Sequence, residues 1–153
     1  MPHRHRWFLT WFGSGLLPWA PGSWGSLAAL PFAWGFVAYG GGPGTLALAA
    51  VALFAIGCIA AESAVREKPL ADPGWLVVDE VAGQWLTLLA APLDVTAYGA
   101  AFLLFRLFDI WKPWPVSWAD RKLTGGFGIM ADDVLAALYA AAMLLVGRMI
   151  LER

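Results

Sequence analysis

Charge is scarce in this sequence. Charged residues make up 14% of its 153 residues, against roughly 25% in an ordinary soluble domain. Hydrophobic residues make up 60%, and the mean hydropathy is +0.66. The formal net charge is -1, so the chain lacks the basic surface that nucleic-acid binding requires, and no nucleic-acid partner is expected. The length suits a single domain, 1–153.

Cysteine and histidine are also rare. Cys58 is the single cysteine, so no internal disulfide can form, and its apolar surroundings indicate a small buried hydrophobe. His3 and His5 stand near the N-terminus, where they are expected to be solvated. The sequence therefore offers no His and Cys set of the kind that binds zinc.

Apolar runs and tryptophan are plentiful instead. There are 10 tryptophans, a residue that favours the boundary between lipid and water. A membrane-spanning helix needs about 20 apolar residues, and a run of about 10–14 can equally be a buried helix of a soluble bundle. We predict an all-α fold, a small polytopic membrane bundle of about five apolar helices. Their predicted ranges are Leu27–Tyr39, Thr45–Ala61, Val81–Ala91, Val95–Phe108 and Val134–Ile150.

The N-terminal residues resemble the start of a signal peptide. Basic residues at 3–6 precede the apolar run Trp7–Phe12. That run is short and ends at a Gly-Ser-Gly sequence, unlike the longer apolar region of a cleaved signal. We therefore expect residues 1–12 to form a basic, aromatic segment lying at the membrane surface.

The loops between the predicted helices differ sharply in charge. An up-and-down connection places the N-terminal segment, residues 62–80 and residues 106–133 on one side of the membrane. That side holds eight of the ten basic residues, which makes it cytoplasmic by the positive-inside rule. It also holds nine of the eleven acidic residues. The prediction is a multi-pass membrane protein with its polar site at the cytoplasmic helix ends.

A glycine-rich stretch, GSGLLPWAPGSWGS at 13–26, precedes the first apolar run. Such a turn can present backbone N–H groups to a phosphate at a helix N-terminus. Ser26 is a candidate N-cap, and Ser23 lies one turn before it. The stretch matches neither the Walker nor the dinucleotide-binding pattern. Spacing alone favours a capped turn over a phosphate site. For the phosphate site, Ser23 and Ser26 are the candidate contacts.

The stretch VVDEVAGQ, residues 77–84, opens the third apolar run. On a helix, Asp79 shares a face with Gly83, and Glu80 shares a face with Gln84. A carboxylate with a glycine one turn away leaves room for a ligand or ion. The alternative is an acidic helix start that suits the helix dipole, but this does not explain Gln84, whose amide needs a hydrogen-bond partner.

A third polar stretch ends the fourth apolar run. Arg106 and Asp109 are three residues apart and can share a helix face, and Lys112 follows immediately before Pro113. The alternative interpretation of the first two is an intrahelical ion pair at a membrane surface. Arg106 and Lys112 are the candidate groups for binding an anionic substrate.

The last apolar run is preceded by LTGGFGIMADD, residues 123–133. We predict that Gly125 and Gly126 form a flexible loop whose N–H groups approach a phosphate. Asp132 and Asp133 are predicted on the first turn of the helix, where negative charge is favoured. Capping alone is the alternative, although a cap needs only one carboxylate.

Together these stretches place several carboxylates at helix ends on one side. Carboxylates brought within a few Å repel each other unless a cation holds them. An all-oxygen ligand set suits Mg²⁺, with Mn²⁺ as the other choice. Metal ligands beside basic residues at a lipid interface point to metal-assisted phosphate chemistry on a lipid headgroup. The predicted metal ligands are Asp79, Glu80, Asp109, Asp132 and Asp133, all but Asp132 also being candidate catalytic residues.

At these residues the sequence resembles the phosphatidylglycerophosphatase A family. The resemblance rests on four blocks in order: PWAPGSWGSL at 18–27, VDEVAGQ at 78–84, FRLFDIWKPWP at 105–115 and GGFGIMADD at 125–133. One departure is Ser23, where threonine would be expected. The resemblance implies a helical, Mg²⁺-dependent bacterial enzyme that removes the terminal phosphate of phosphatidylglycerophosphate to give phosphatidylglycerol. It also implies that the five acidic residues form the site and that Arg106 and Lys112 face the phosphate.

Several alternatives stay open at this point. The attacking group is either a water activated by the metal or an aspartate that forms a transient acyl phosphate. The enzyme could instead be a phosphatase or phosphotransferase for another lipid-linked phosphate. A non-enzymatic membrane scaffold or a transporter is a third class, although a transporter should carry ionisable groups at mid-membrane. The sequence predicts a phospholipid substrate and a membrane as partners, and does not predict an oligomeric state.

Overall fold

All regular structure in the part of the chain that the computed structural model describes, residues 3–67 and 74–153, is helical. The all-α prediction is therefore confirmed for those residues. Lys68 and Asp72, which belong to a predicted charged stretch, lie outside them. The elements are α1 (His3–Leu9), η1 (Ser14–Leu16), α2 (Pro21–Tyr39), α3 (Pro43–Glu67), α4 (Val78–Leu88), α5 (Val95–Trp111), α6 (Val116–Lys122) and α7 (Gly125–Leu151).

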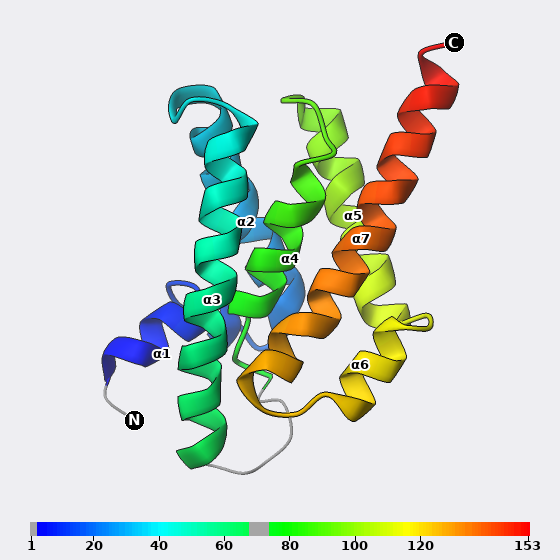
Figure 1. Cartoon of the computed structure of the whole chain (residues 1–153). Helices are drawn as coiled ribbons and strands as arrows, with labels where there is room; N and C mark the ends of the chain where they lie inside the picture. The colour runs from blue at the N-terminus through cyan, green and yellow to red at the C-terminus, as the bar shows by residue number, and fades with distance from the viewer. Residues whose placement is uncertain (1–2, 68–73) are drawn as a thin grey trace.

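The five longer helices run up and down (Figure 1). Helices α2, α4 and α7 start at one end of the bundle, and α3 and α5 finish there. We call this the site end. Helices α1 and α6 also lie toward the site end, whereas the α2–α3 and α4–α5 connections lie at the opposite end. The predicted convergence of the polar helix ends on one side of the bundle thus follows from the chain's topology.

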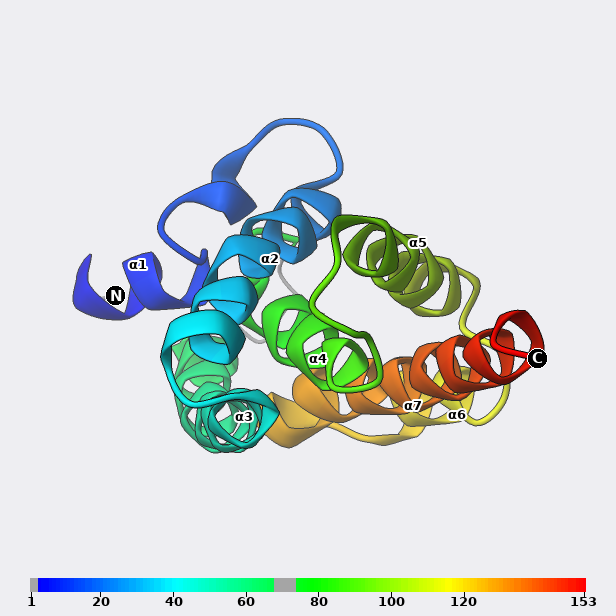
Figure 2. The ribbon, with the colours of Figure 1, turned by 90° about the horizontal axis from the view of Figure 1, so that it is seen from above.

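Helix α4 lies in the middle of the bundle, with α2, α3, α5 and α7 around it (Figure 2). Nine of its eleven residues are buried. The Trp85 indole N–H donates a hydrogen bond to the Ala29 carbonyl of α2 at 3.0 Å. Because other helices enclose it, most of its side chains face protein, which explains why this short run is largely apolar.

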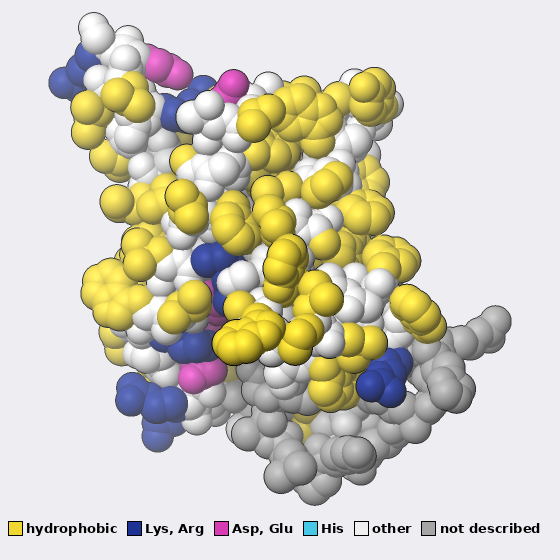
Figure 3. Space-filling view, turned by 180° about the vertical axis from the view of Figure 1, so that it is seen from behind, with side chains coloured by type: hydrophobic (Ala, Val, Ile, Leu, Met, Phe, Trp, Pro, Cys, Tyr) yellow, Lys and Arg dark blue, Asp and Glu magenta, His cyan; other side chains and the backbone are white. Residues whose placement is uncertain are grey.

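Two of the described helices are long and apolar enough to cross a membrane: α3, over Pro43–Arg66, and α7. Helix α4, at about 16 Å, is far shorter than the roughly 30 Å hydrocarbon core. The prediction of five apolar membrane helices is thus confirmed only as a helical bundle with two helices of spanning length. Hydrophobic side chains nevertheless cover much of the face shown in Figure 3.

Helix α7 starts nine residues earlier than predicted. It begins at Gly125, so the GGFG sequence forms its first turn, and the predicted flexible loop is wrong. Gly126 allows α7 to pack closely against α3, because a Cβ at this position would collide with the α3 backbone at Cys58 and Glu62. Asp132 and Asp133 consequently lie about two turns inside the helix and are buried. Their predicted place on the first turn, and with it the capping explanation, is wrong.

Helix α2 also starts earlier than predicted. Pro21 occupies its first turn, a position that suits the fixed φ of proline and its missing N–H. Ala20 stands at the N-cap without a side-chain hydrogen bond, and Ser26 is buried inside the helix. The prediction of Ser26 as an N-cap is therefore wrong.

The N-terminal segment packs onto the site end. The Val77 N–H donates to the Leu9 carbonyl at 2.9 Å. The ring of Trp11 lies 5.1 Å from that of Phe32 and 5.4 Å from that of Trp85, centroid to centroid. These contacts hold the residues before α2 against the start of α4 and against α2 itself.

Candidate active site

Three carboxylates from two helices meet at the site end. Asp79 and Glu80 lie on the first turn of α4, and Asp133 projects from α7. One carboxylate oxygen of each lies within 4.8 Å of the others. Asp79 and Asp133 are only 5% and 2% exposed. This convergence confirms that acidic residues far apart in the sequence come together.

Close packing between helices creates this convergence. A Cβ at Gly83 would lie 2.6 Å from the Phe105 ring of α5 and 3.1 Å from the Asp133 carbonyl oxygen of α7. Glycine is therefore what lets α5 and α7 approach α4 one turn beyond Asp79. The space that we predicted beside Gly83 for a ligand is filled by Phe105, so that interpretation is corrected.

Arg106 joins the carboxylates from α5. Its Nη1 forms an ion pair with Asp109 Oδ2 on one helix face, as the alternative interpretation of these two residues expected. The same nitrogen lies 3.9 Å from Glu80 Oε1. A Cβ at Gly22 would lie 3.0 Å from Arg106 Nη2 and would collide with Glu80 Oε1. The first turn of α2 therefore rests directly on this arginine and glutamate.

A second ionic cluster joins α5, α6 and α7. Lys112 Nζ lies 2.7 Å from Asp132 Oδ2 and 3.0 Å from Asp120 Oδ1. Burial alone would lower the pKa of Lys112, but its hydrogen bond to Asp132 and the neighbouring carboxylate charges raise that pKa above its usual value. Lys112 is thus a fixed cation beside the first cluster, and Asp132 is its principal partner.

The first cluster has the properties of a divalent-cation site. Glu80 Oε2 and Asp133 Oδ2 are buried and have no hydrogen-bond partner among the described residues. Burial raises the pKa of Glu80, and the nearby charge of Asp109 adds to this, while a hydrogen bond with Asp79 and the charge of Arg106 oppose it. Close, buried oxygen donors with unused lone pairs suit Mg²⁺ or Mn²⁺. The residues present therefore fit the predicted metal.

Two buried polar side chains extend from this cluster between α2 and α4. Gln84 is fully buried, and neither its amide nitrogen nor its oxygen has a partner among the described residues. The Ser26 hydroxyl is likewise buried without one. Ser23 is half-buried one turn after Ala20. Gln84 thus lies where we predicted, one turn beyond Glu80, while its expected hydrogen-bond partner is not seen.

The predicted phosphate contacts at Gly125 and Gly126 lie next to α3. The Gly126 N–H donates to Glu62 Oε2 at 2.7 Å. The same glutamate accepts from Arg66 at 3.0 Å. A phosphate would have to displace Glu62 before it could bind this N–H, so the role of these two glycines stays a prediction.

Three residues that matter to the site were not recognised from the sequence: Gly22, Glu62 and Asp120. Gly22 lies inside the PGSWGS run. The run stood out in the sequence, but nothing in it indicated that Gly22 contacts Arg106. Asp120 lies eight residues after Lys112, and its approach depends on how the chain turns through the proline-rich segment between them. Glu62 pairs across 64 residues, a separation that leaves no local pattern.

Comparison with known proteins identifies the family to which these clusters belong. The model of the phosphatidylglycerophosphatase A family matches residues 7–148. The chain belongs to the phosphatidylglycerophosphatase A family. The match includes all four blocks that carry the resemblance, and both ionic clusters fall inside it.

Relatives in bacteria support the same family. A phosphatidylglycerophosphatase A of Escherichia coli is 42% identical over 87% of this chain and 77% of its own length. One from Haemophilus influenzae is 44% identical over 84% of this chain and 79% of its own. A Bacteroides thetaiotaomicron protein named "Putative phosphatidylinositol-3-phosphatase" is 40% identical over 93% and 92%. No solved structure matches the chain at a significant level.

Proposed function

We propose that this protein hydrolyses the terminal phosphate monoester of phosphatidylglycerophosphate and releases phosphatidylglycerol. The observation that carries this proposal is the convergence of Asp79, Glu80 and Asp133 beside the Arg106 guanidinium. These carboxylates can hold a metal ion, and the guanidinium beside them can bind a phosphate. Phosphate-ester hydrolysis requires both kinds of group. Family membership supports the identity of the lipid.

The proposed cofactor is Mg²⁺, with Mn²⁺ as the alternative. Asp79, Glu80 and Asp133 would hold the ion, which when bound supplies positive charge to the phosphate undergoing hydrolysis. Asp109 and Asp132 were also predicted as ligands. Asp109 pairs with Arg106, and Asp132 pairs with Lys112. We therefore assign to Asp109 and Asp132 the role of positioning these two basic side chains.

Arg106 is the residue that we assign to bind the phosphate. Its guanidinium is held on one side by Asp109, and its Nε is buried without a partner among the described residues. A planar guanidinium can donate to two oxygens of one phosphate. Lys112, fixed by Asp132 and Asp120, adds positive charge at the edge of the same site.

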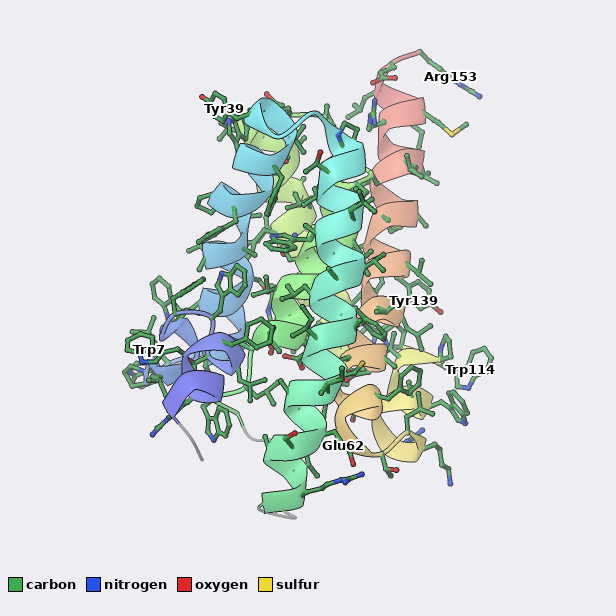
Figure 4. All side chains as sticks on the ribbon, turned by 60° about the vertical axis from the view of Figure 1, so that its left-hand side comes forward. Trp7, Tyr39, Glu62, Trp114, Tyr139 and Arg153 are labelled. Carbon is green, nitrogen blue, oxygen red and sulfur yellow. The ribbon has the colours of Figure 1, made fainter. Side chains whose placement is uncertain are left out.

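We further propose that the protein is a multi-pass protein of the bacterial inner membrane, with the site end toward the cytoplasm. Helices α3 and α7 are of spanning length. Figure 4 shows Trp7 and Trp114 on opposite sides of the bundle near the site end, with Tyr39 and Arg153 at the other end. Both tryptophans are exposed, at 62% and 73%. Exposed tryptophans at one level mark a membrane interface.

The test is phosphate release from phosphatidylglycerophosphate by the purified protein in detergent. We expect release with Mg²⁺ and its loss with excess EDTA, restored when Mg²⁺ is returned. A panel containing phosphatidylinositol 3-phosphate and an isoprenoid diphosphate measures specificity, since one relative is named for the first of these lipids. Preference for either panel lipid over phosphatidylglycerophosphate would overturn the assigned substrate.

A further inference from the structure

Helices α2 and α5 form the wall of the bundle on the face away from α3 (Figures 1 and 2). They run antiparallel and approach each other at two levels. Toward the far end, the rings of Trp34 and Tyr98 are 5.3 Å apart, centroid to centroid. At the site end, Gly22 abuts Arg106. Between these two levels lie Leu27 of α2 and Leu103 of α5.

Leu27 and Leu103 are large apolar side chains left exposed, at 44% and 67%. Leu27 lies four residues after Ser23, and Leu103 lies three residues before Arg106, so each shares a helix face with a polar residue of the site. On each of α2 and α5, an exposed apolar surface therefore leads along the helix to a polar residue assigned to the site. Ile110, one turn beyond Arg106, is 68% exposed and continues this surface.

The polar cluster reaches the surface at this same place. The side chains of Arg106 and Glu80 are 13% and 16% exposed, whereas Asp79 and Asp133 are more deeply buried. Figure 3, which views this face of the molecule, shows Lys or Arg and Asp or Glu atoms at mid-height with hydrophobic side chains around them. Arg106 and Glu80 are therefore the groups through which the cluster reaches the surface.

We propose that the lipid substrate reaches the site sideways, from the membrane leaflet, across the lateral face formed by Leu27, Leu103, Arg106 and Ile110. The phosphate would bind at Arg106 while the first part of the acyl chains lies against Leu27 and Leu103. This inference rests on the proposed function. A soluble phosphate ester gains nothing from exposed leucines, whereas a phospholipid matches both the apolar surface and the buried cation.

The experiment compares two substrates with the same headgroup. Long-chain phosphatidylglycerophosphate in mixed micelles and its water-soluble deacylated analogue, which keeps the headgroup and has no acyl chains, are assayed with wild type, Leu27→Gln, Leu103→Gln and the double variant. Leu48→Gln is the matched control, because Leu48 on α3 is 75% exposed and lies on another helix. Circular dichroism confirms that each variant keeps its helical content.

We expect kcat/KM for the long-chain lipid to fall about tenfold in the double variant, because two contacts with the acyl chains are lost. The deacylated analogue should be hydrolysed by every variant as by wild type, and the control variant should not change with either substrate. Equal losses on both substrates, or no loss on either, would overturn the lateral route while leaving the phosphatase proposal intact. Wild-type protein that hydrolyses neither substrate would overturn both.

Discussion

Gly22 of α2 and Arg106 of α5 are in such close contact that a Cβ at position 22 would stand 3.0 Å from Arg106 Nη2. The contact joins the glycine-rich stretch before the first apolar run to the basic residue of the fourth. It gives that stretch a structural role, since the helix backbone itself forms one side of the site. Any side chain at position 22 must displace Arg106 or Glu80.

Gly22→Ala should therefore lower activity without unfolding the protein. The added methyl group displaces the guanidinium, and misplacing a binding group by about 1 Å can cost about 100-fold in rate. The measurement is kcat/KM for phosphate release. Gly35→Ala is the control within the same helix, because a Cβ there meets nothing within 4 Å. Equal activity of the two variants would show that the contact does not position Arg106.

Asp79→Asn and Asp133→Asn should each remove most activity. Loss of a charged ligand weakens metal binding and transition-state stabilisation, for which we expect a decrease of at least about 100-fold. Glu152→Gln, an exposed position at the C-terminus, serves as the control and should keep full activity.

The thermal stability of Asp133→Asn should not fall together with its activity. Asp133 is 2% exposed and lies beside Asp79 and Glu80, so replacing it with asparagine removes repulsion between buried like charges. Without metal, the Tm of Asp133→Asn should equal or exceed that of wild type. A large fall in Tm would indicate that the aspartate is needed for folding and that lost activity follows from unfolding.

The effect of Mg²⁺ on stability should depend on pH. The pKa of Glu80 is raised in the folded protein, so its contribution to stability is fully present below the unfolded pKa of about 4.3 and is lost as pH rises through the folded pKa. The metal-free protein should thus be less stable at pH 8 than at pH 5.5. Because Mg²⁺ binds ionised carboxylates, it should raise Tm more at pH 8. A shift that is independent of pH would contradict the site.

Lys112→Met should destabilise the site end. It removes the partner of Asp132, which is 4% exposed, and leaves that carboxylate buried without its cation. The expected loss in the free energy of unfolding is about 1–3 kcal/mol. Lys122→Met on α6, whose side chain is exposed, provides the comparison. Chemical denaturation in detergent measures both, and equal stabilities would mean that the Lys112–Asp132 pair contributes little.

The helical class and the convergence of Asp79, Glu80 and Asp133 could be predicted because hydrophobic runs and their connections place the starts of α4 and α7 at the same end of the bundle. The position of Asp133 about two turns inside α7 could not. Arg106 and Asp109 could be paired because a spacing of three residues is a local property of a helix. Helix boundaries could not be predicted as well. The GGFG sequence looks like a loop, but it forms the first turn of α7, with Gly126 packed against the α3 backbone.

Contacts between distant segments also could not be predicted from the sequence. Gly22 meets Arg106, and Glu62 meets the Gly126 N–H, through the packing of whole helices. Phe105 fills the space beside Gly83 for the same reason. The central position of α4 explains why the predicted run Val81–Ala91 resembles a short membrane helix although most of α4 is surrounded by protein.

The most direct test measures Mn²⁺ binding by electron paramagnetic resonance together with phosphate release, for wild type and Asp133→Asn in the same detergent. We predict that wild type binds Mn²⁺, that Mg²⁺ displaces it, and that the substitution weakens binding and turnover together. Full turnover of phosphatidylglycerophosphate by Asp133→Asn, or by wild type stripped of divalent ions, would contradict a cation held by Asp79, Glu80 and Asp133.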